Sequence, residues 1–239
     1  MTSGPGPFYV ALGDSISIDD YAGGTGRGGA SLLFCNRDDD FPEWRGRDLL
    51  TLAPATAFVL LATDGATTRT LLQAQLPRLR ALPGRPTLVT LTVGGNDLLS
   101  AYGDTVAARA VISSVEAAVD AALGELAGRL APGGRIVVGT VYDPSDGTGD
   151  AARLGLPPWT DAVAVIGELN EALRGAAARH GAAVADIAGA FLGHGLGAGD
   201  PTQRDPRPPH RDLWFCNLIE PNAWGAGGVR GAFWAAIGA

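Results

Sequence analysis

Ser15 has the residue type and the position best suited to covalent chemistry in this chain. It ends the sequence Gly13-Asp14-Ser15, which directly follows the short apolar run 8–12 near the N-terminus. A serine on the turn that leaves a first strand can be presented as a nucleophile toward a carbonyl carbon. The alternative for Ser15 is a helix N-cap, because Gly-Asp-Ser sequences also form plain turns and caps.

Two further polar clusters each follow an apolar run. Residues 63–67 read Thr-Asp-Gly-Ala-Thr, and residues 94–97 read Gly-Gly-Asn-Asp. Acyl transfer requires hydrogen-bond donors aimed at the oxygen that becomes negative, and backbone N–H groups and asparagine side chains are such donors. Taken singly, the glycines of both clusters are equally consistent with ordinary turns.

The ordered clusters resemble the SGNH, or GDSL-type, hydrolase family over nearly the whole chain. Gly13-Asp14-Ser15 is similar to the family's first block, Gly65 to a glycine of its second, and the cluster 94–97 to its third. Residues 169–186 are similar to the family's penultimate helix and last strand. The resemblance implies that the backbone N–H groups of Ser15 and Gly65 and the Asn96 side chain form an oxyanion hole, each donor being worth about 3 kcal/mol. It implies neither a metal ion nor a cofactor.

The chain departs from the family pattern where the general base is expected. The family carries Asp-x-x-His-Pro-Asn before its last helix, whereas this chain has Asn217 and Glu220 in place of the aspartate and the histidine. Free glutamate is a poorer proton acceptor than imidazole by about 3 kcal/mol, although burial raises the pKa of a carboxyl group. We predict that Glu220 acts as the base and accepts an N–H hydrogen bond from the Asn217 side chain.

A histidine elsewhere in the chain is the alternative base. His210 lies ten residues before Glu220 in a proline-rich segment, so that a loop can fold it over Ser15. His194 follows the last predicted strand, and His180 ends a predicted helix, where contact with the helix dipole is the ordinary role. A surface position is the simpler interpretation of each, and His210 is the better candidate base.

Alternating strand-like and helix-like segments position these residues. They predict a three-layer α/β/α sandwich with a five-stranded parallel sheet, the flavodoxin-like arrangement that the family resemblance also implies. In such sheets ligands bind beyond the carboxyl ends of the strands, where Ser15, Gly65 and Asn96 fall. The predicted strands span 8–12, 57–62, 87–93, 135–141 and 182–187, and the predicted helices span 67–82, 105–130, 160–180 and 222–237.

Composition favours a single domain over residues 1–239. With 46% hydrophobic residues, a chain of this length can bury one sizeable core. The proline- and charge-rich segment 199–212 is predicted to be a surface loop or lid rather than a linker. A net charge of −7 disfavours nucleic acid as a partner. We expect no membrane partner and a cytoplasmic location, because no leader-like or membrane-length apolar run is present.

The acidic and aromatic clusters admit two interpretations each. The aspartates at 19–20 and 38–40 have the chemistry of a hard-cation site, but their spacing favours solvated loops, and we predict no metal. Four of the five tryptophans, Trp44, Trp159, Trp214 and Trp224, either line an acyl or sugar pocket or pack against the core. Trp214 and Trp224 are of most interest because they flank the predicted base.

The leading interpretation is a serine hydrolase that cleaves a small-molecule ester, such as a short acyl ester or an O-acetyl sugar, through Ser15. The alternative is a catalytically silent domain that binds an ester or carbohydrate. Transfer of the acyl group to an alcohol would use the same site. The sequence leaves the acyl length and the oligomeric state open.

Overall fold

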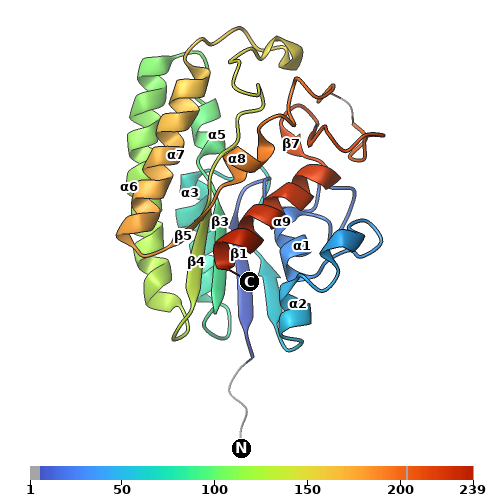
Figure 1. The fold of residues 1–239 in the computed structure, drawn as a ribbon. Coiled ribbons are helices and arrows are strands. Elements are labelled where there is room, and N and C mark those ends of the chain that lie inside the picture. Colours follow the sequence, from blue (N-terminus) through green and yellow to red (C-terminus); the bar gives the residue numbers. More distant parts are fainter. Residues whose placement is uncertain (1–5, 203, 239) are drawn as a thin grey trace, which may run out of the picture.

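A five-stranded parallel sheet forms the centre of the computed structural model, which describes residues 6–202 and 204–238 (Figure 1). The strand order is β2-β1-β3-β4-β5, and all four neighbouring pairs are parallel. This order confirms the predicted flavodoxin-like sheet. The strands are β1 (Phe8–Gly13), β2 (Ala57–Leu60), β3 (Leu88–Thr92), β4 (Arg135–Gly139) and β5 (Ala183–Ala185).

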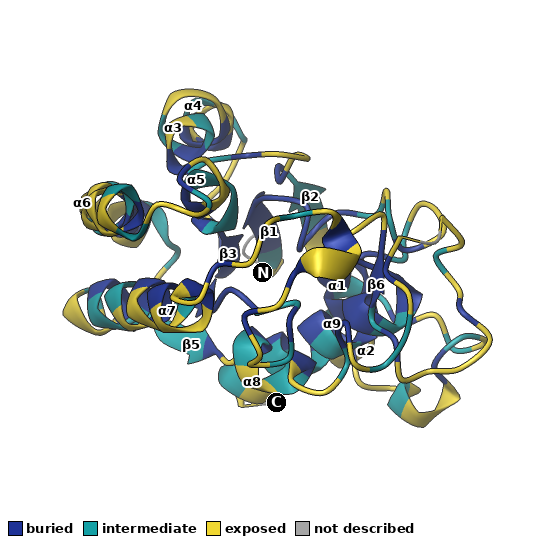
Figure 2. Cartoon of the chain, turned by 90° about the horizontal axis from the view of Figure 1, so that it is seen from above, coloured by how far each residue is buried: buried dark blue, intermediate teal, exposed yellow. Residues whose placement is uncertain are grey.

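Helices cover both faces of the sheet and complete the three layers of the predicted sandwich, as Figure 2 shows from above. One face carries α3 (Thr68–Thr70), the π-helical segment η2 (Leu71–Gln75), α4 (Leu76–Arg80), α5 (Gly95–Leu99), α6 (Thr105–Arg129) and α7 (Ala162–Arg179). The other face carries α1 (Gly29–Phe34), α2 (Leu49–Leu52), α8 (Ile187–Phe191) and α9 (Ala223–Ile237). The 3-10 turns η1 (Pro42–Trp44) and η3 (Ala152–Leu154) lie in the connections.

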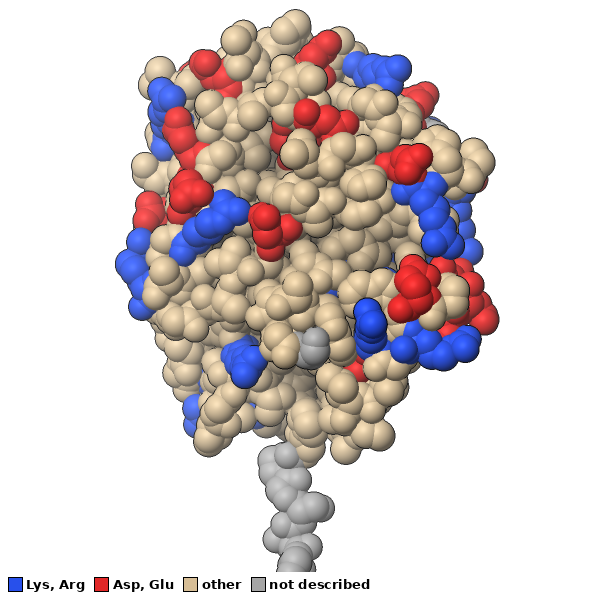
Figure 3. Space-filling view, viewed as in Figure 1, with Lys and Arg blue, Asp and Glu red and all other residues tan. Residues whose placement is uncertain are grey.

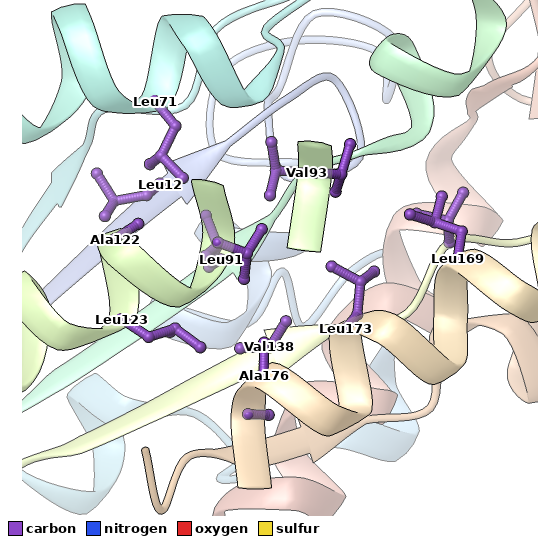
Figure 4. Packing of buried hydrophobic residues seen from close by; sticks show 14 of the residues in the cluster. Leu12, Leu71, Leu91, Val93, Ala122, Leu123, Val138, Leu169, Leu173 and Ala176 are labelled. Carbon is purple, nitrogen blue, oxygen red and sulfur yellow. The ribbon is translucent and has the colours of Figure 1, made fainter. Parts of the chain in front are cut away.

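Each face of the sheet has its own hydrophobic cluster. In the larger one, strand leucines face side chains of α6 and α7 (Figure 4). One side of α6 forms an apolar stripe along the helix, because Val115, Val119 and Leu123 are buried and Val111 packs against the same cluster. Burying one such side chain contributes about 1.5–3 kcal/mol, so these rows fix the helix against the sheet.

The structure differs from the sequence prediction mainly in short elements. The predicted helix 67–82 is three consecutive pieces, and α1, α2, α5 and α8 were not predicted. Strands β6 (Phe215–Cys216) and β7 (Glu220–Pro221) form an unpredicted antiparallel hairpin. Elements of two to six residues are too short to show a periodic pattern of apolar residues.

The segment 199–212 runs between α8 and β6 and is attached to the body of the molecule. The Pro201 carbonyl accepts a hydrogen bond from the backbone N–H of Leu218 at 2.8 Å, and the Pro206 carbonyl accepts one from Ala223 at 3.0 Å. Arg207 pairs with Asp40 at 3.2 Å. These anchors hold the segment beside the β6–β7 hairpin.

The surface charge relates to the prediction about nucleic acid, and the apolar character of the helices relates to the prediction about membranes. On the face shown in Figure 3, arginines lie beside acidic side chains and do not gather into a basic patch. None of the helices in the described ranges has the length and apolar character needed to cross a membrane.

Candidate active site

The turn after β1 places Ser15 at the carboxyl edge of the sheet. Gly13 has a φ of 122°, and a Cβ on it would lie 1.9 Å from the Thr92 carbonyl oxygen, so the close approach of β1 to β3 requires glycine. The backbone N–H of Asp14 donates to that same carbonyl at 3.0 Å. Residues 14–17 form a turn and the first helix begins at Gly29, so the helix-cap interpretation of Ser15 is wrong.

Gln75 fixes this turn from the neighbouring helical segment. Its Oε1 accepts from the backbone N–H of Gly13 at 2.8 Å, and its Nε2 donates to the Gly13 carbonyl at 2.7 Å. Nε2 also lies 3.3 Å from the Thr63 hydroxyl, which ties the turn after β1 to the turn after β2. Sequence reasoning missed Gln75, because a glutamine inside a predicted helix carries no distinguishing signal.

Asn96 and Asp97 connect the third cluster to the second. The Asn96 Nδ2 donates to the Ala66 carbonyl at 3.1 Å, and the Asp97 carboxylate accepts from the Thr68 hydroxyl at 2.6 Å and from the Thr68 backbone N–H at 3.0 Å. Gly65 directly precedes Ala66 in an exposed turn with a φ of 65°. The structure therefore brings the three clusters to one edge of the sheet.

Glu220 comes to Ser15 on the β6–β7 hairpin. Its carboxyl group is partly buried, and its Oε2 has no hydrogen-bond partner in the described structure. Burial raises the pKa of Glu220, hydrogen bonding with the Ser15 hydroxyl lowers it, and the negative charge of Asp64 raises it. A carboxylate with a free oxygen beside a serine hydroxyl is suited to accept a proton from it.

Asn222 locks the hairpin onto α9. Its Oδ1 caps the helix by accepting from the backbone N–H groups of Trp224 at 2.9 Å and Gly225 at 3.0 Å. Its Nδ2 donates to the carbonyls of Leu213 at 2.8 Å and Phe215 at 3.2 Å. Because Asn222 is fully buried, these four bonds fix the position from which Glu220 extends.

A pocket opens beside Ser15 and has Asn96 in its wall. Ile219 of the hairpin, helices α5 and α7 and the loop after β4 supply other parts of the wall. Among the four tryptophans, Trp159 lines this pocket. Trp44, Trp214 and Trp224 line a separate groove along α9, so the two tryptophans that flank Glu220 in sequence do not face the pocket.

The sequence comparison decides the family. The profile of the GDSL-like lipase/acylhydrolase family matches residues 11–226, which include all the clusters described above. This chain belongs to the GDSL-like lipase/acylhydrolase family. Among curated protein sequences, none matches the chain.

Solved structures of related fold cover the whole GDSL-like domain. The α/β hydrolase LAE5 from the metagenome of Lake Arreo is 22% identical, with a TM-score of 0.64 over 99% of this chain and 97% of its own. Phospholipase A1 from Streptomyces albidoflavus is 23% identical, with a TM-score of 0.62 over 97% and 99% of the two chains. A catalytic mutant of the acetylxylan esterase Axe2 from Geobacillus stearothermophilus is 17% identical, with a TM-score of 0.65 over 100% and 97%. At these identities the likeness shows the fold.

Two predictions about the base of this GDSL-like chain require correction. Asn217 is exposed at the hairpin tip with a φ of 46°, and the predicted hydrogen bond to Glu220 is not formed. His210 is exposed, and none of the described residues of 199–212 lines the Ser15 pocket, because that segment is anchored elsewhere. The structure thus brings Ser15, Asn96 and Glu220 together, with Gly65 adjacent, and leaves His210 outside.

The other two histidines have structural contacts. His194 stacks on Trp214 with ring centroids 3.9 Å apart, and its Nδ1 lies 2.8 Å from the Asp212 carbonyl. His180 follows α7 and its Nε2 lies 3.2 Å from Asp120. Neither lines the pocket that contains Ser15.

A second buried carboxyl group lies directly beside Ser15. Asp14 is 2% exposed, and this burial raises its pKa to about 7. Hydrogen bonds from Thr92 and from the backbone N–H of Ile16 lower the pKa, and the negative charge of Glu220 raises it. Its Oδ1 accepts from the Ile16 N–H at 3.2 Å. The site therefore holds two carboxyl groups that resist being ionised together.

Proposed function

We propose that this chain hydrolyses carboxylic esters, with Ser15 as the nucleophile and Glu220 as the general base. The observation that carries the proposal is the interaction of the Glu220 carboxylate with the Ser15 hydroxyl at a pocket that also presents Asn96. Nucleophile, base and oxyanion donor are the minimum set for acyl transfer. Membership of an acylhydrolase family supports the reaction class.

The reaction proceeds through an acyl-enzyme. The Ser15 oxygen bonds to the ester carbonyl carbon while its proton passes to Glu220, and the carbonyl oxygen becomes negative. The N–H groups of Ser15 and Gly65 and the Asn96 amide donate to that oxygen, each for about 3 kcal/mol. Collapse breaks the bond to the alkoxide, which takes the proton from Glu220. Water then repeats the sequence on the acyl-enzyme and releases the acid, and an alcohol in place of water would give acyl transfer.

A histidine is among the catalytic positions of the compared esterase, and we assign the role of the base in this chain to Glu220. Structures of Axe2 in which a serine, an aspartate or a histidine is replaced by alanine are described as catalytic mutants. In this chain, burial and the Asp64 charge raise the pKa of Glu220, which makes the carboxylate a stronger base than free glutamate.

The test combines active-site labelling with a matched base variant. A fluorophosphonate probe should label Ser15 in the native protein and not in Ser15→Ala. Glu220→Gln keeps the size of the side chain and should lower kcat/KM for a simple ester about 10²–10⁴-fold, whereas His210→Ala should retain full activity. Full turnover by Glu220→Gln would exclude Glu220 as the base. Absence of labelling in the native protein would favour the silent binding domain.

A further inference from the structure

The pocket beside Ser15 is small and apolar away from the reaction centre. Its volume is about 110 Å³. Ser15 and Asn96 contribute to one part of its lining, and the rest is mainly aliphatic and aromatic. The aliphatic wall includes Leu98, Leu99, Val141, Leu154, Leu156 and Ile166.

Most polar groups in the wall are already paired with the protein and are not free to bind a polar ligand. Tyr102 and Trp159, which contact each other edge to face at 5.1 Å, both donate to protein oxygens. Asp143 accepts from its own loop, and the Ser145 hydroxyl donates to it. These bonds join Tyr102 to the Pro157 carbonyl at 2.8 Å, Trp159 to Thr105 at 3.0 Å, Tyr142 to the Ile219 carbonyl at 2.6 Å, and Asp143 to Ser145 at 2.7 Å.

We propose that this pocket holds the acyl group of the ester and selects chains of four or five carbons. The inference rests on the proposed function, because the acyl chain enters this pocket when its carbonyl carbon is placed against Ser15 for attack. An apolar cavity of about 150 Å³ accommodates benzene, so a pocket of this volume suits a slightly smaller apolar group. An acetyl group leaves most of the apolar wall uncovered, and a chain of about twelve carbons exceeds the space.

Two wall residues set the depth of the pocket. Ala162 is the first residue of α7 and lines the pocket with a single methyl group, so a larger side chain there removes volume. Trp159 is buried and lines the same pocket, so its truncation adds volume. Neither residue contacts the reacting atoms in the proposed mechanism, which makes them determinants of chain length only.

The experiment measures kcat/KM for p-nitrophenyl esters from acetate to dodecanoate. For the native protein we expect an increase of about fourfold per methylene, the equivalent of about 0.8 kcal/mol, up to butanoate or pentanoate and a fall for longer chains. Ala162→Leu should move the optimum to acetate or propionate, and Trp159→Ala should move it beyond hexanoate. The matched controls are Ala178→Leu, at an exposed position of α7, and Trp234→Ala on α9, both outside the pocket.

The outcomes separate this inference from the proposed function. A native optimum at acetate or dodecanoate, or a profile that Ala162→Leu leaves unchanged, would overturn the chain-length assignment while fluorophosphonate labelling of Ser15 upholds the hydrolase. Absence of both turnover and labelling would overturn the two together. If Trp159→Ala does not fold, Ala162→Leu alone tests the assignment of the acyl pocket. A shorter optimal chain with unchanged labelling of Ser15 supports the assignment, and an unaltered chain-length profile excludes it.

Discussion

Replacing Asp14 by asparagine should remove a pH-dependent loss of stability. Asp14 is almost completely buried, and that burial is the main reason its pKa rises from 3.8 to about 7 in the folded protein. Glu220 adds negative charge nearby, while Thr92 and the backbone N–H of Ile16 oppose the rise. Asparagine keeps a carbonyl oxygen for the Ile16 N–H and carries no charge at any pH.

The sign follows from proton linkage. Between about pH 4 and pH 7 the unfolded chain has released the Asp14 proton and the native protein has not, so the native state binds more protons and the free energy of unfolding falls as the pH rises. A shift from 3.8 to about 7 corresponds to about 4 kcal/mol. This contribution is fully present below about pH 4 and is lost above about pH 7.

The assay compares urea unfolding of the native protein and Asp14→Asn, followed by tryptophan fluorescence at pH 4 and pH 8. The free energy of unfolding of Asp14→Asn minus that of the native protein should be more positive at pH 8 than at pH 4, by up to about 4 kcal/mol. Comparing the two pH values cancels any cost of the substitution that does not depend on pH. Asp39→Asn, at an exposed position, should give the same difference at both. An Asp14→Asn difference that does not change with pH would refute the reasoning.

Three further predictions concern the groups around Ser15. Asn96→Ala should lower kcat for ester hydrolysis about 10²–10³-fold while the urea midpoint changes little, and steady-state kinetics beside an unfolding curve will show whether the two effects separate. Gln75→Leu should lower the free energy of unfolding by about 1–3 kcal/mol, because it leaves the buried N–H of Gly13 without a partner, while the Gly13 carbonyl keeps the N–H of Thr63 at 3.0 Å; an unchanged free energy of unfolding in urea would contradict this. The pH profile of kcat/KM should rise through an apparent pKa above the ordinary value of glutamate, since burial, and then the Asp64 charge, raises the pKa of Glu220. Asp64→Asn should therefore move the rising limb to lower pH, and a limb that stays in place would show that another group titrates there.

The sequence predicts the fold well where segments are long or fully buried. Strands β1 and β3 are mostly apolar and almost fully buried because both faces of a central parallel strand are covered, and α6 shows its stripe over many turns. The β6–β7 hairpin has two residues per strand, and its turn uses Asn217 and Leu218 at positive φ. No periodic pattern marks such an element, yet it positions Glu220.

Motif residues were easier to predict than the contacts that hold them. Ser15 and Asn96 follow strands, and parallel strands end at one edge of the sheet, so their meeting follows from topology. The role of Gln75 depends on which way a π-helical side chain points, which sequence spacing does not specify. The predicted hydrogen bond between Asn217 and Glu220 was wrong for a similar reason. Residues three apart would meet on a helix, but here Asn217 lies in a turn with positive φ and is exposed to solvent.

A carboxylate base and a buried acidic neighbour are two consequences of the same environment. Exchanging imidazole for glutamate costs about 3 kcal/mol of basicity in water. The burial that raises the pKa of Glu220 recovers part of that difference, and the negative charge of Asp64 acts in the same direction. The same burial raises the pKa of Asp14 and lowers the stability of the fold at neutral pH. The proposed reaction needs a strong proton acceptor beside Ser15, and the burial that supplies it also encloses a second carboxyl group, Asp14, whose ionisation costs stability.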